Sequence, residues 1–129
     1  MTALPELART LLDANVFVVL TTINPDGGPQ SSVIWAKRDG DQVVFSTILG
    51  RRKTRNLQRD PRVSLCFYDP AEPYWYVELR GTVTMTQEGG PELINELSQR
   101  YVGRPFTESS PSNVRVVCRL HLTKAIVHQ

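Results

Sequence analysis

The feature of the sequence best suited to binding chemistry is a cluster of cations at residues 51–59, called here the basic segment. It holds five of the fifteen Lys and Arg residues of the 129-residue chain and none of the thirteen Asp and Glu residues. Its cations are Arg51, Arg52, Lys53, Arg55 and Arg59. Because the positive charge is concentrated at one place, the sequence favours one localised anionic ligand. Nucleic acid usually needs a broader basic face.

The residues around the basic segment indicate how it would bind an anion. Gly50 precedes it and Asp60-Pro61 follows it, and a residue before proline avoids helical geometry, so we expect a helix over residues 51–59. Free N–H groups and the positive end of the dipole at the helix start would then face a ligand. Arg can bind phosphate through two hydrogen bonds, and Lys adds a point charge. A solvated helix face without a ligand is the alternative, and the pattern alone leaves both open.

Other catalytic constellations are not supported. No Ser stands in a Gly-x-Ser-x-Gly motif and neither cysteine has an evident His partner, so we do not expect nucleophilic catalysis. Cys118 and His121 are three residues apart and would lie on opposite faces of a strand, so we expect no metal site. Glu72 and Glu78 lack neighbours that would separate their pKa values, and we interpret them as surface charges.

A run of three aromatic residues, Tyr74, Trp75 and Tyr76, offers flat surfaces. With Trp35 on another strand, Trp75 and Tyr76 could border a planar ligand or fill a subunit interface. Successive strand residues alternate between faces, so at least one of the three must point away from the interior. We therefore include Trp75 and Tyr76 among the candidate cofactor contacts.

The elements that must position these residues are mainly strands. Helical spacing predicts helices over residues 2–13 and 91–101, besides the one in the basic segment. Runs of β-branched residues between turn residues predict strands over 16–23, 30–37, 42–47, 63–68 and 74–86, and one or two strands over 114–127. Gly81 is expected to mark a bulge or bend. In the third strand, Val43, Phe45 and Thr47 would share one face, with Val44 and Ser46 on the other.

Six or more strands with only short flanking helices predict a closed or nearly closed antiparallel β-barrel, a mainly β (α+β) fold in a single domain over residues 1–129. A doubly wound nicotinamide-binding sheet is disfavoured because no Gly-x-Gly-x-x-Gly follows a strand. A domain of this size has little volume to enclose a large ligand alone. A site shared between two subunits would solve that difficulty.

The cysteines and the N-terminal residues indicate the compartment. Cys66 and Cys118 stand in apolar, β-rich runs, which favours buried free thiols over an exported disulfide framework. The sequence begins without a basic and then apolar leader, and no apolar stretch approaches about 18 residues, so we expect neither secretion nor a membrane span. We expect a cytoplasmic protein.

Several motifs, taken in order, carry a resemblance to a known family. They are Val18 to Thr22 with the following Pro-Asp-Gly turn, Pro29 to Trp35, Val44 to Thr47 leading to Arg52 to Leu57, Arg59 to Val63, and Val77 to Val83. In this order they resemble the flavin and deazaflavin oxidoreductases with the split β-barrel fold, related to pyridoxamine 5′-phosphate oxidase. The resemblance spans nearly the whole chain.

The resemblance implies a homodimer with two cofactor sites at the subunit interface. By analogy, Ser32, Val33, Ile34 and Trp35 would run beside the tricyclic ring, and Ser46 and Thr47 would contact ring or ribityl oxygens. The phosphate would be held by Arg52, Lys53 and Arg55, with Asn56 as a weaker member.

The Arg-rich segment and the compact length resemble the branch of the family that uses the deazaflavin coenzyme F420. The phospholactyl and oligoglutamate tail of F420 would offer carboxylates to Arg51 and Arg59. Residues 32–37 lack the Arg-x-x-Leu-Leu-Lys run of the oxidase branch, which argues against FMN and against pyridoxamine phosphate oxidation. FMN remains the alternative cofactor.

The predicted function is an F420-dependent reductase that transfers a hydride between reduced F420 and a small or planar organic substrate. Such a reaction needs no general acid, and Lys37 is only a weak candidate for a proton donor or a substrate contact. The substrate cannot be read from the pattern because the pocket wall would come from loops at residues 69–73 and 103–113. Two rival functions are a nucleic-acid-binding module using the basic segment and a non-enzymatic carrier of a deazaflavin or haem.

Overall fold

The structure, a computed structural model, describes residues 3–129 and contains in that range three helices and seven strands. The helices are α1 (Glu6–Asp13), α2 (Arg52–Arg59) and α3 (Gly90–Val102). The strands are β1 (Val18–Ile23), β2 (Pro29–Ile34), β3 (Ala36–Asp39), β4 (Gln42–Ile48), β5 (Arg62–Asp69), β6 (Glu72–Thr86) and β7 (Arg115–His128). All seven belong to one antiparallel sheet in the order β2-β1-β5-β6-β7-β4-β3.

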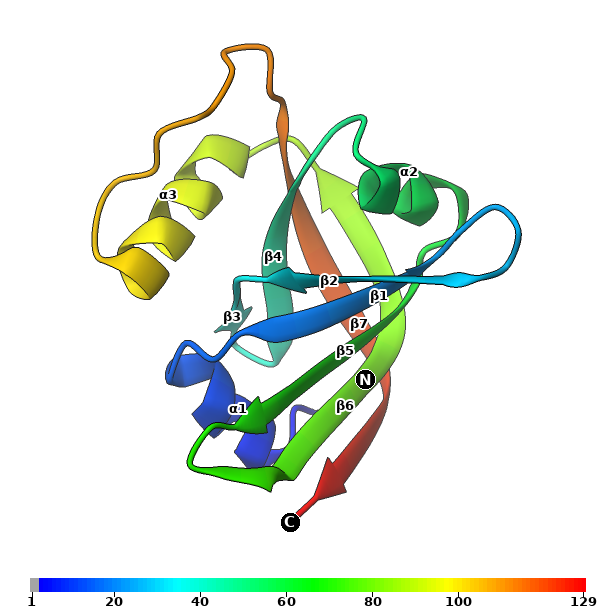
Figure 1. The fold of residues 1–129 in the computed structure, drawn as a ribbon, viewed down its shortest axis with the longest axis vertical. Helices are drawn as coiled ribbons and strands as arrows, with labels where there is room; N and C mark the ends of the chain where they lie inside the picture. The colour runs from blue at the N-terminus through cyan, green and yellow to red at the C-terminus, as the bar shows by residue number, and fades with distance from the viewer. Residues whose placement is uncertain (1–2) are drawn as a thin grey trace.

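The sheet is curled into a split barrel (Figure 1). Its two edge strands, β2 and β3, are consecutive in the chain and only Trp35 separates them. The chain can pass from one edge to the other through a single residue because the curl brings the edges together. The single strand predicted over residues 30–37 is therefore wrong, since the chain changes edge at Trp35. The predicted mainly β barrel with short helices is confirmed.

The core fills the inside of the curl. On β4, Val43 and Phe45 belong to the main core. Thr47, predicted on the same face, is also buried, and its hydroxyl contacts that of Thr54 on α2. Val44 points to the other face and packs with residues of α3 and β7 in a second apolar cluster, which includes Leu97. α3 thus covers the outer side of β4, while α1 contributes Leu7, Leu11 and Leu12 to the main core.

Several predicted boundaries change. α1 begins at Glu6 after Pro5, so the predicted start near residue 2 is wrong for residues 3–5, and residue 2 lies outside the described residues. The pairing of β6 with β7 shifts register between Arg80 and Gly81, which confirms the expected irregularity there. A Cβ at Gly81 would clash with the carbonyl oxygen of His121, so only glycine fits. Residues 115–128 form one long strand.

The two cysteines are free, and they differ in burial. Cys118 is buried on β7, and the loss of solvation raises the pKa of its thiol to about 12. The prediction that Cys66 is also buried is wrong. On β5, Leu65 and Phe67 point into the core, so the alternation of the strand turns Cys66 outward. Within residues 3–129, no helix is long and apolar enough to cross a membrane.

Candidate functional site

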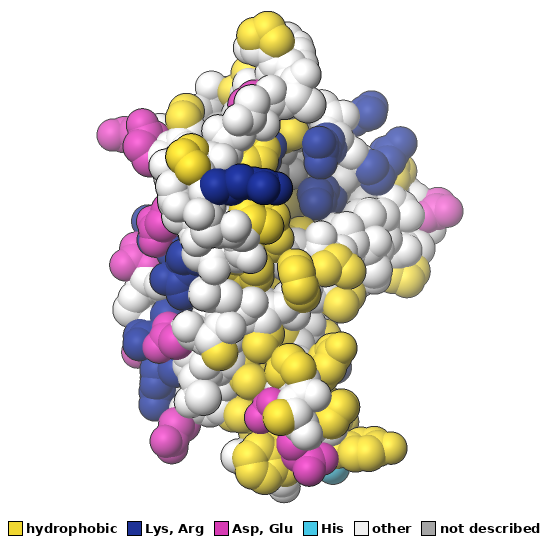
Figure 2. Space-filling model, turned by 60° about the vertical axis from the view of Figure 1, so that its left-hand side comes forward, with side chains coloured by type: hydrophobic (Ala, Val, Ile, Leu, Met, Phe, Trp, Pro, Cys, Tyr) yellow, Lys and Arg dark blue, Asp and Glu magenta, His cyan; other side chains and the backbone are white. Residues whose placement is uncertain are grey.

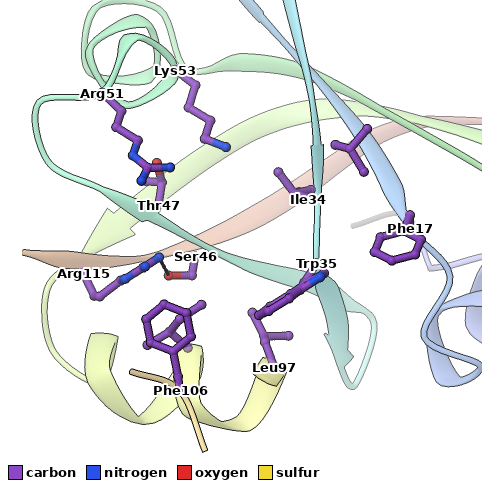
Figure 3. Close-up of a pocket in the computed structure, with 12 residues that line it drawn as sticks. Phe17, Ile34, Trp35, Ser46, Thr47, Arg51, Lys53, Leu97, Phe106 and Arg115 are labelled. Atoms are coloured by element: carbon purple, nitrogen blue, oxygen red, sulfur yellow. Dashed lines mark hydrogen bonds between the residues drawn. The ribbon is translucent and has the colours of Figure 1, made fainter. Parts of the chain in front are cut away.

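A cavity of about 240 Å³ opens beside the seam where β2 gives way to β3 (Figure 3). One side of its wall is cationic, with Arg51 and Lys53 at the start of α2 and Arg115 at the start of β7. Ser46 and Thr47 of β4 provide hydroxyl groups. The remaining wall is apolar and is made by Phe17, Val33, Ile34, Trp35, Ile94, Leu97 and Phe106.

The position of α2 is fixed by buried hydrogen bonds on its inner face. The hydroxyl groups of Thr47 and Thr54 lie 2.7 Å apart, and Thr54 donates to the carbonyl oxygen of Ile48 at 2.6 Å. Asn56 is fully buried and donates from Nδ2 to Thr22 Oγ1 and to Asn24 Oδ1, both at 3.0 Å. Because α2 is bonded to both β1 and β4, its N-terminal residues are held beside the cavity.

A sharp turn joins β4 to α2. Gly50 has a φ of 93°, in the left-handed region that favours glycine. Arg51 follows in an extended conformation as the N-cap residue, and its side chain makes no capping hydrogen bond. The first N–H groups of a helix have no intrahelical partner. The N-terminal end of α2 therefore offers both free donors and cationic side chains to a ligand in the cavity.

Lys53 carries the clearest electrostatic signal of the cavity. Its side chain is half-buried, and its Nζ lies 3.4 Å from Ser32 Oγ. Burial, and secondly the nearby charge of Arg51, lowers the pKa of Lys53 from its usual value. Neither Arg51 nor Lys53 pairs with a carboxylate of residues 3–129. Two adjacent cations that form no ion pair with a carboxylate of residues 3–129 make a site that an anion would stabilise.

Arg115 is held in a different way. It donates from Nε and Nη2 to the two carboxylate oxygens of Glu108, at 2.6 and 3.1 Å. Its guanidinium lies 4.7 Å from the ring centre of Phe106, and its Nη1 is 3.4 Å from Ser46 Oγ (Figure 3). The hydrogen bonds from Arg115 and Asn113 keep the pKa of Glu108 below its usual value.

An aromatic stack supports the apolar wall. The rings of Trp35 and Tyr101 are stacked at 5.5 Å with an interplanar angle of 15°, and Phe17 lies 5.7 Å from Tyr101. The Tyr101 hydroxyl accepts a hydrogen bond from the Ala36 N–H at 3.1 Å and lies 2.7 and 2.9 Å from the carbonyl oxygens of Val16 and Ala36. One residue of α3 thus ties together the chain on both sides of the barrel seam and orients Trp35.

We expect the Tyr101→Phe substitution to lower the free energy of unfolding by about 1–3 kcal/mol, because it removes the hydroxyl but keeps the stacked ring. The Ala36 N–H and the Val16 carbonyl would lose their partner at a half-buried site. Urea denaturation measures the change. Tyr74→Phe is the matched control, since Tyr74 is 76% exposed. Removing its hydroxyl should not measurably change the free energy of unfolding. Equal stability of the two variants would contradict this role of Tyr101.

Seven of the residues predicted for the cofactor site line the cavity. They are Val33, Ile34, Trp35, Ser46, Thr47, Arg51 and Lys53. Ser32 is not part of the wall but its hydroxyl contacts Lys53. The residues predicted from the strand before the seam and from the end of β4 are therefore brought together with the start of the basic segment.

The other members of the basic segment point elsewhere. Arg52 and Arg55 are exposed and do not line the cavity, and Arg55 donates to the Gly50 carbonyl at 3.1 Å. Asn56 is buried, with its amide bonded to β1 and the following turn, so it does not reach the cavity. Arg59 bonds to the Ile23 carbonyl and to Asn56. Of the residues predicted to hold the phosphate, only Lys53 lines the cavity, and it lies beside Arg51, which was predicted to contact the tail.

The remaining predicted candidates also lie away from the cavity. Trp75 and Tyr76 stand near the start of β6, where Tyr76 stacks on His128 with ring centres 5.1 Å apart. Lys37 bonds to both carboxylate oxygens of Glu96, at 2.8 and 2.9 Å. Neither the aromatic run nor Lys37 lines this cavity.

The sequence prediction missed five residues of the wall: Phe17, Ile94, Leu97, Phe106 and Arg115. Phe106 lies in the loop at residues 103–113, which was expected to form part of a pocket wall, whereas no residue of the expected loop 69–73 lines this cavity. Arg115 and Glu108 are seven residues apart across an irregular loop, and no local periodicity links them. Within residues 3–129, no group of three or more His, Cys, Asp or Glu side chains could hold a metal ion.

Known proteins share this fold. A solved structure named F420 reductase is 32% identical, with a TM-score of 0.84, and the match covers 95% of this chain and 98% of that one. A conserved hypothetical protein of Mycobacterium tuberculosis is 24% identical, with a TM-score of 0.77 and coverage of 98% and 86% of the two chains.

Sequence relatives point in the same direction. A pyridoxine/pyridoxamine 5′-phosphate oxidase of Rubrobacter xylanophilus is 39% identical over 72 residues, which are 55% of this chain but only 33% of the length of that enzyme. The family profile of pyridoxamine 5′-phosphate oxidase matches residues 4–128, almost the whole chain. With its split barrel and the cavity at the seam, the chain belongs to the pyridoxamine 5′-phosphate oxidase family of oxidoreductases.

Proposed function

We propose that this protein is an F420-dependent oxidoreductase that binds the cofactor in the cavity beside the barrel seam, with the phosphate on Arg51 and Lys53. The observation that carries the proposal is the half-buried Lys53 next to Arg51 at the start of α2, neither of which pairs with a carboxylate of residues 3–129. An anion there would offset the repulsion and the loss of solvation that lower the pKa of Lys53.

The rest of the cavity fits the other parts of a flavin-type cofactor. Val33, Ile34 and Trp35 provide an apolar side of the cavity for a tricyclic ring. Ser46 makes only a long contact with Arg115, so its hydroxyl is available to a ribityl chain, while Thr47 is already bonded to Thr54. The cations of the cavity therefore suit the phosphate, the Ser46 hydroxyl suits the ribityl chain, and the apolar wall suits the ring.

When bound, such a cofactor supplies the hydride chemistry. The ionisable side chains that line the cavity are those of Arg51, Lys53 and Arg115, so the described wall offers cations and hydroxyl groups but no carboxylate or imidazole. The residues of this chain would bind and orient the reactants and exclude water. Lys37 is not proposed as a proton donor, because its ammonium is paired with Glu96 outside the cavity.

Two observations favour the deazaflavin over FMN. The relative named F420 reductase matches this chain over almost its full length, whereas the oxidase match spans a third of that enzyme. Arg52 and Arg55 stand exposed beside the cationic wall without ion pairs in the described part of the chain, so they could attract an acidic tail. Figure 2 shows several cations gathered around a hollow on this face.

We further propose that a second copy of the chain completes the site. The cavity of about 240 Å³ is smaller than most ligand pockets, which measure about 300–1,000 Å³. Phe17 and Val33 line it and yet are 61% and 66% exposed. Val19 lies directly beside Val33, and Cys66 beside Val19, on the outer face of the sheet. An exposed apolar strip that starts at the cavity wall is what a subunit interface would cover.

Competitive fluorescence titration with F420 and FMN tests the proposed function. We expect saturable binding of F420, with FMN at least about tenfold weaker. Tighter binding of FMN would contradict the deazaflavin preference but leave a flavin-type pocket in place. Binding of neither cofactor would contradict the proposed function as a whole.

A further inference from the structure

The loop between α3 and β7 brings an acidic residue, Glu108, against Arg115, which lines the cavity. This loop passes along the outside of α3 before it enters β7 (Figure 1). It is tied down at Phe106, whose N–H donates to Asn95 Oδ1 at 3.0 Å, and at Glu108, which accepts from Asn113 Nδ2 at 3.1 Å. Glu108 is therefore a fixed carboxylate, and its strongest partner is Arg115.

Arg115 is immobilised by two residues of the preceding loop, Glu108 and Phe106. Glu108 takes Nε and Nη2 in a forked contact, and the ring of Phe106 supports the face of the guanidinium. The side chain of Arg115 is only 12% exposed. Its Nη1 has one long contact, at 3.4 Å, with the hydroxyl of Ser46. The guanidinium therefore keeps hydrogen-bonding capacity in a fixed direction at the cavity wall, between Ser46 and Phe106 (Figure 3).

Arg115 differs from Arg51 and Lys53 because its charge is paired with a carboxylate. Glu108 neutralises Arg115, whereas Arg51 and Lys53 have no carboxylate partner within residues 3–129. A phosphate is bound most strongly by cations that are not already paired with a carboxylate. A paired and rigid guanidinium is better suited to donate a directed hydrogen bond to a neutral oxygen. The paired cation and the two cations without a carboxylate partner thus fit different parts of a ligand.

We propose that Arg115 orients the bound ring by donating to one of its carbonyl oxygens, and that Glu108 is the positioning residue that aims Arg115. This inference rests on the proposed function, because it assumes that a flavin-type ring enters the cavity. It adds a ring-binding pair from the C-terminal strand and its preceding loop to the phosphate-binding pair from α2.

The test uses two probes: F420 and its phosphate-free fragment, which carries only the deazaflavin ring and the ribityl chain. We expect Arg115→Met to weaken binding of both probes by at least about tenfold, the loss expected for a charged hydrogen-bond donor. Lys53→Ala should weaken binding of F420 but should change the affinity for the fragment by less than about threefold. Arg119→Met is the matched control, because Arg119 is also on β7 and ion-paired, to Asp39 at 2.9 Å, but does not line this cavity. It should leave both affinities unchanged.

Coupling between the two residues separates positioning from general structural support. Glu108→Gln should weaken binding of the fragment several-fold. Adding Glu108→Gln to Arg115→Met should cause no further loss of affinity, because Glu108 acts through Arg115. Arg115→Lys keeps a cation beside Glu108 but loses the fork, so it provides a variant that should stay folded and still bind the fragment weakly. Thermal unfolding of each variant checks that binding is measured on folded protein.

Three outcomes would overturn the inference. The first is an unchanged affinity of the fragment in both Arg115 variants. The second is a loss confined to F420, which would make Arg115 a phosphate ligand. The third is additive losses in the double variant. If the wild-type protein binds F420 normally in these cases, the proposed function stands and only the inference fails; if it binds neither probe, the proposed function fails and the inference fails with it.

Discussion

Replacing Arg51 and Lys53 together by alanine is expected to weaken F420 binding by about 100-fold or more. Each side chain would make a charged hydrogen bond to the phosphate, and each such bond contributes about 1.5–3 kcal/mol. Both residues line the cavity and neither has a carboxylate partner within residues 3–129. Fluorescence titration of F420 against the variant and the wild-type protein measures the loss.

The matched control is the replacement of Arg52 and Arg55 by alanine, which removes the same number of charges from the same helix. Both side chains are exposed and lie off the cavity wall, so solvent would screen their attraction to the acidic tail, and the expected loss is less than about fivefold. Equal losses in the two double variants would show that the net charge of α2, and not the geometry of the cavity, determines binding.

The Arg51→Ala/Lys53→Ala variant should also remain as stable as the wild type or become more stable. The folded-state pKa of Lys53 is lowered by burial and by Arg51, so its protonated form is disfavoured in the folded protein. At neutral pH the charge on Lys53 therefore lowers the free energy of unfolding. This loss of stability would disappear only as the pH rises from the folded-state pKa of Lys53 through its higher unfolded-state pKa. Removal of the charge should leave the melting temperature unchanged or raise it. A site kept for binding shows this trade-off between stability and function.

Replacing Val19 and Val33 by aspartate is expected to convert the proposed dimer to monomers and to abolish most cofactor binding. The two side chains are paired neighbours on the outer face of β1 and β2, and Val33 also lines the cavity. Two carboxylates in an apolar interface would lose their hydration without gaining partners, which should weaken dimerisation by at least about 100-fold. Sedimentation equilibrium measures the dimer, and F420 titration measures the site.

Val114→Asp is the control for the interface variant, because Val114 is 39% exposed, against 38% for Val19, and stands outside the apolar strip. It should leave the oligomeric state and the F420 affinity unchanged. A wild-type protein that is monomeric at all concentrations and still binds F420 tightly would contradict the shared site.

The sequence predicted most elements because their signals are local. Turn residues separate the strands, and alternation on β4 correctly placed Val43 and Phe45 on one face, which in the structure is the face toward the core. The break at Trp35 has no local signal, since it arises where the curled sheet meets Tyr101, some 65 residues later in the chain. Cys66 shows the same limit: the apolar run around it does not reveal which alternate residues face the core.

The sequence predicted which segments form the candidate site, but it did not predict which face of α2 is turned toward the cavity. The composition of the basic segment identified a stretch of chain that borders the cavity, but the buried contacts of Thr54 and Asn56 determine which of its cations face the cavity. These contacts turn Arg52 and Arg55 outward and leave Arg51 and Lys53 on the wall. Arg115, Glu108 and Phe106 meet only after the loop has folded back over α3, so spacing in the sequence could not link them.

A crystal structure of the complex with F420 would show where the cofactor binds. We expect the phosphate within hydrogen-bonding distance of Lys53 Nζ and the Arg51 guanidinium, with the ring against Val33 to Trp35 beside the barrel seam. A phosphate bound by Arg52 and Arg55 on the outer face of α2, or a ring bound away from the cavity, would contradict this expectation.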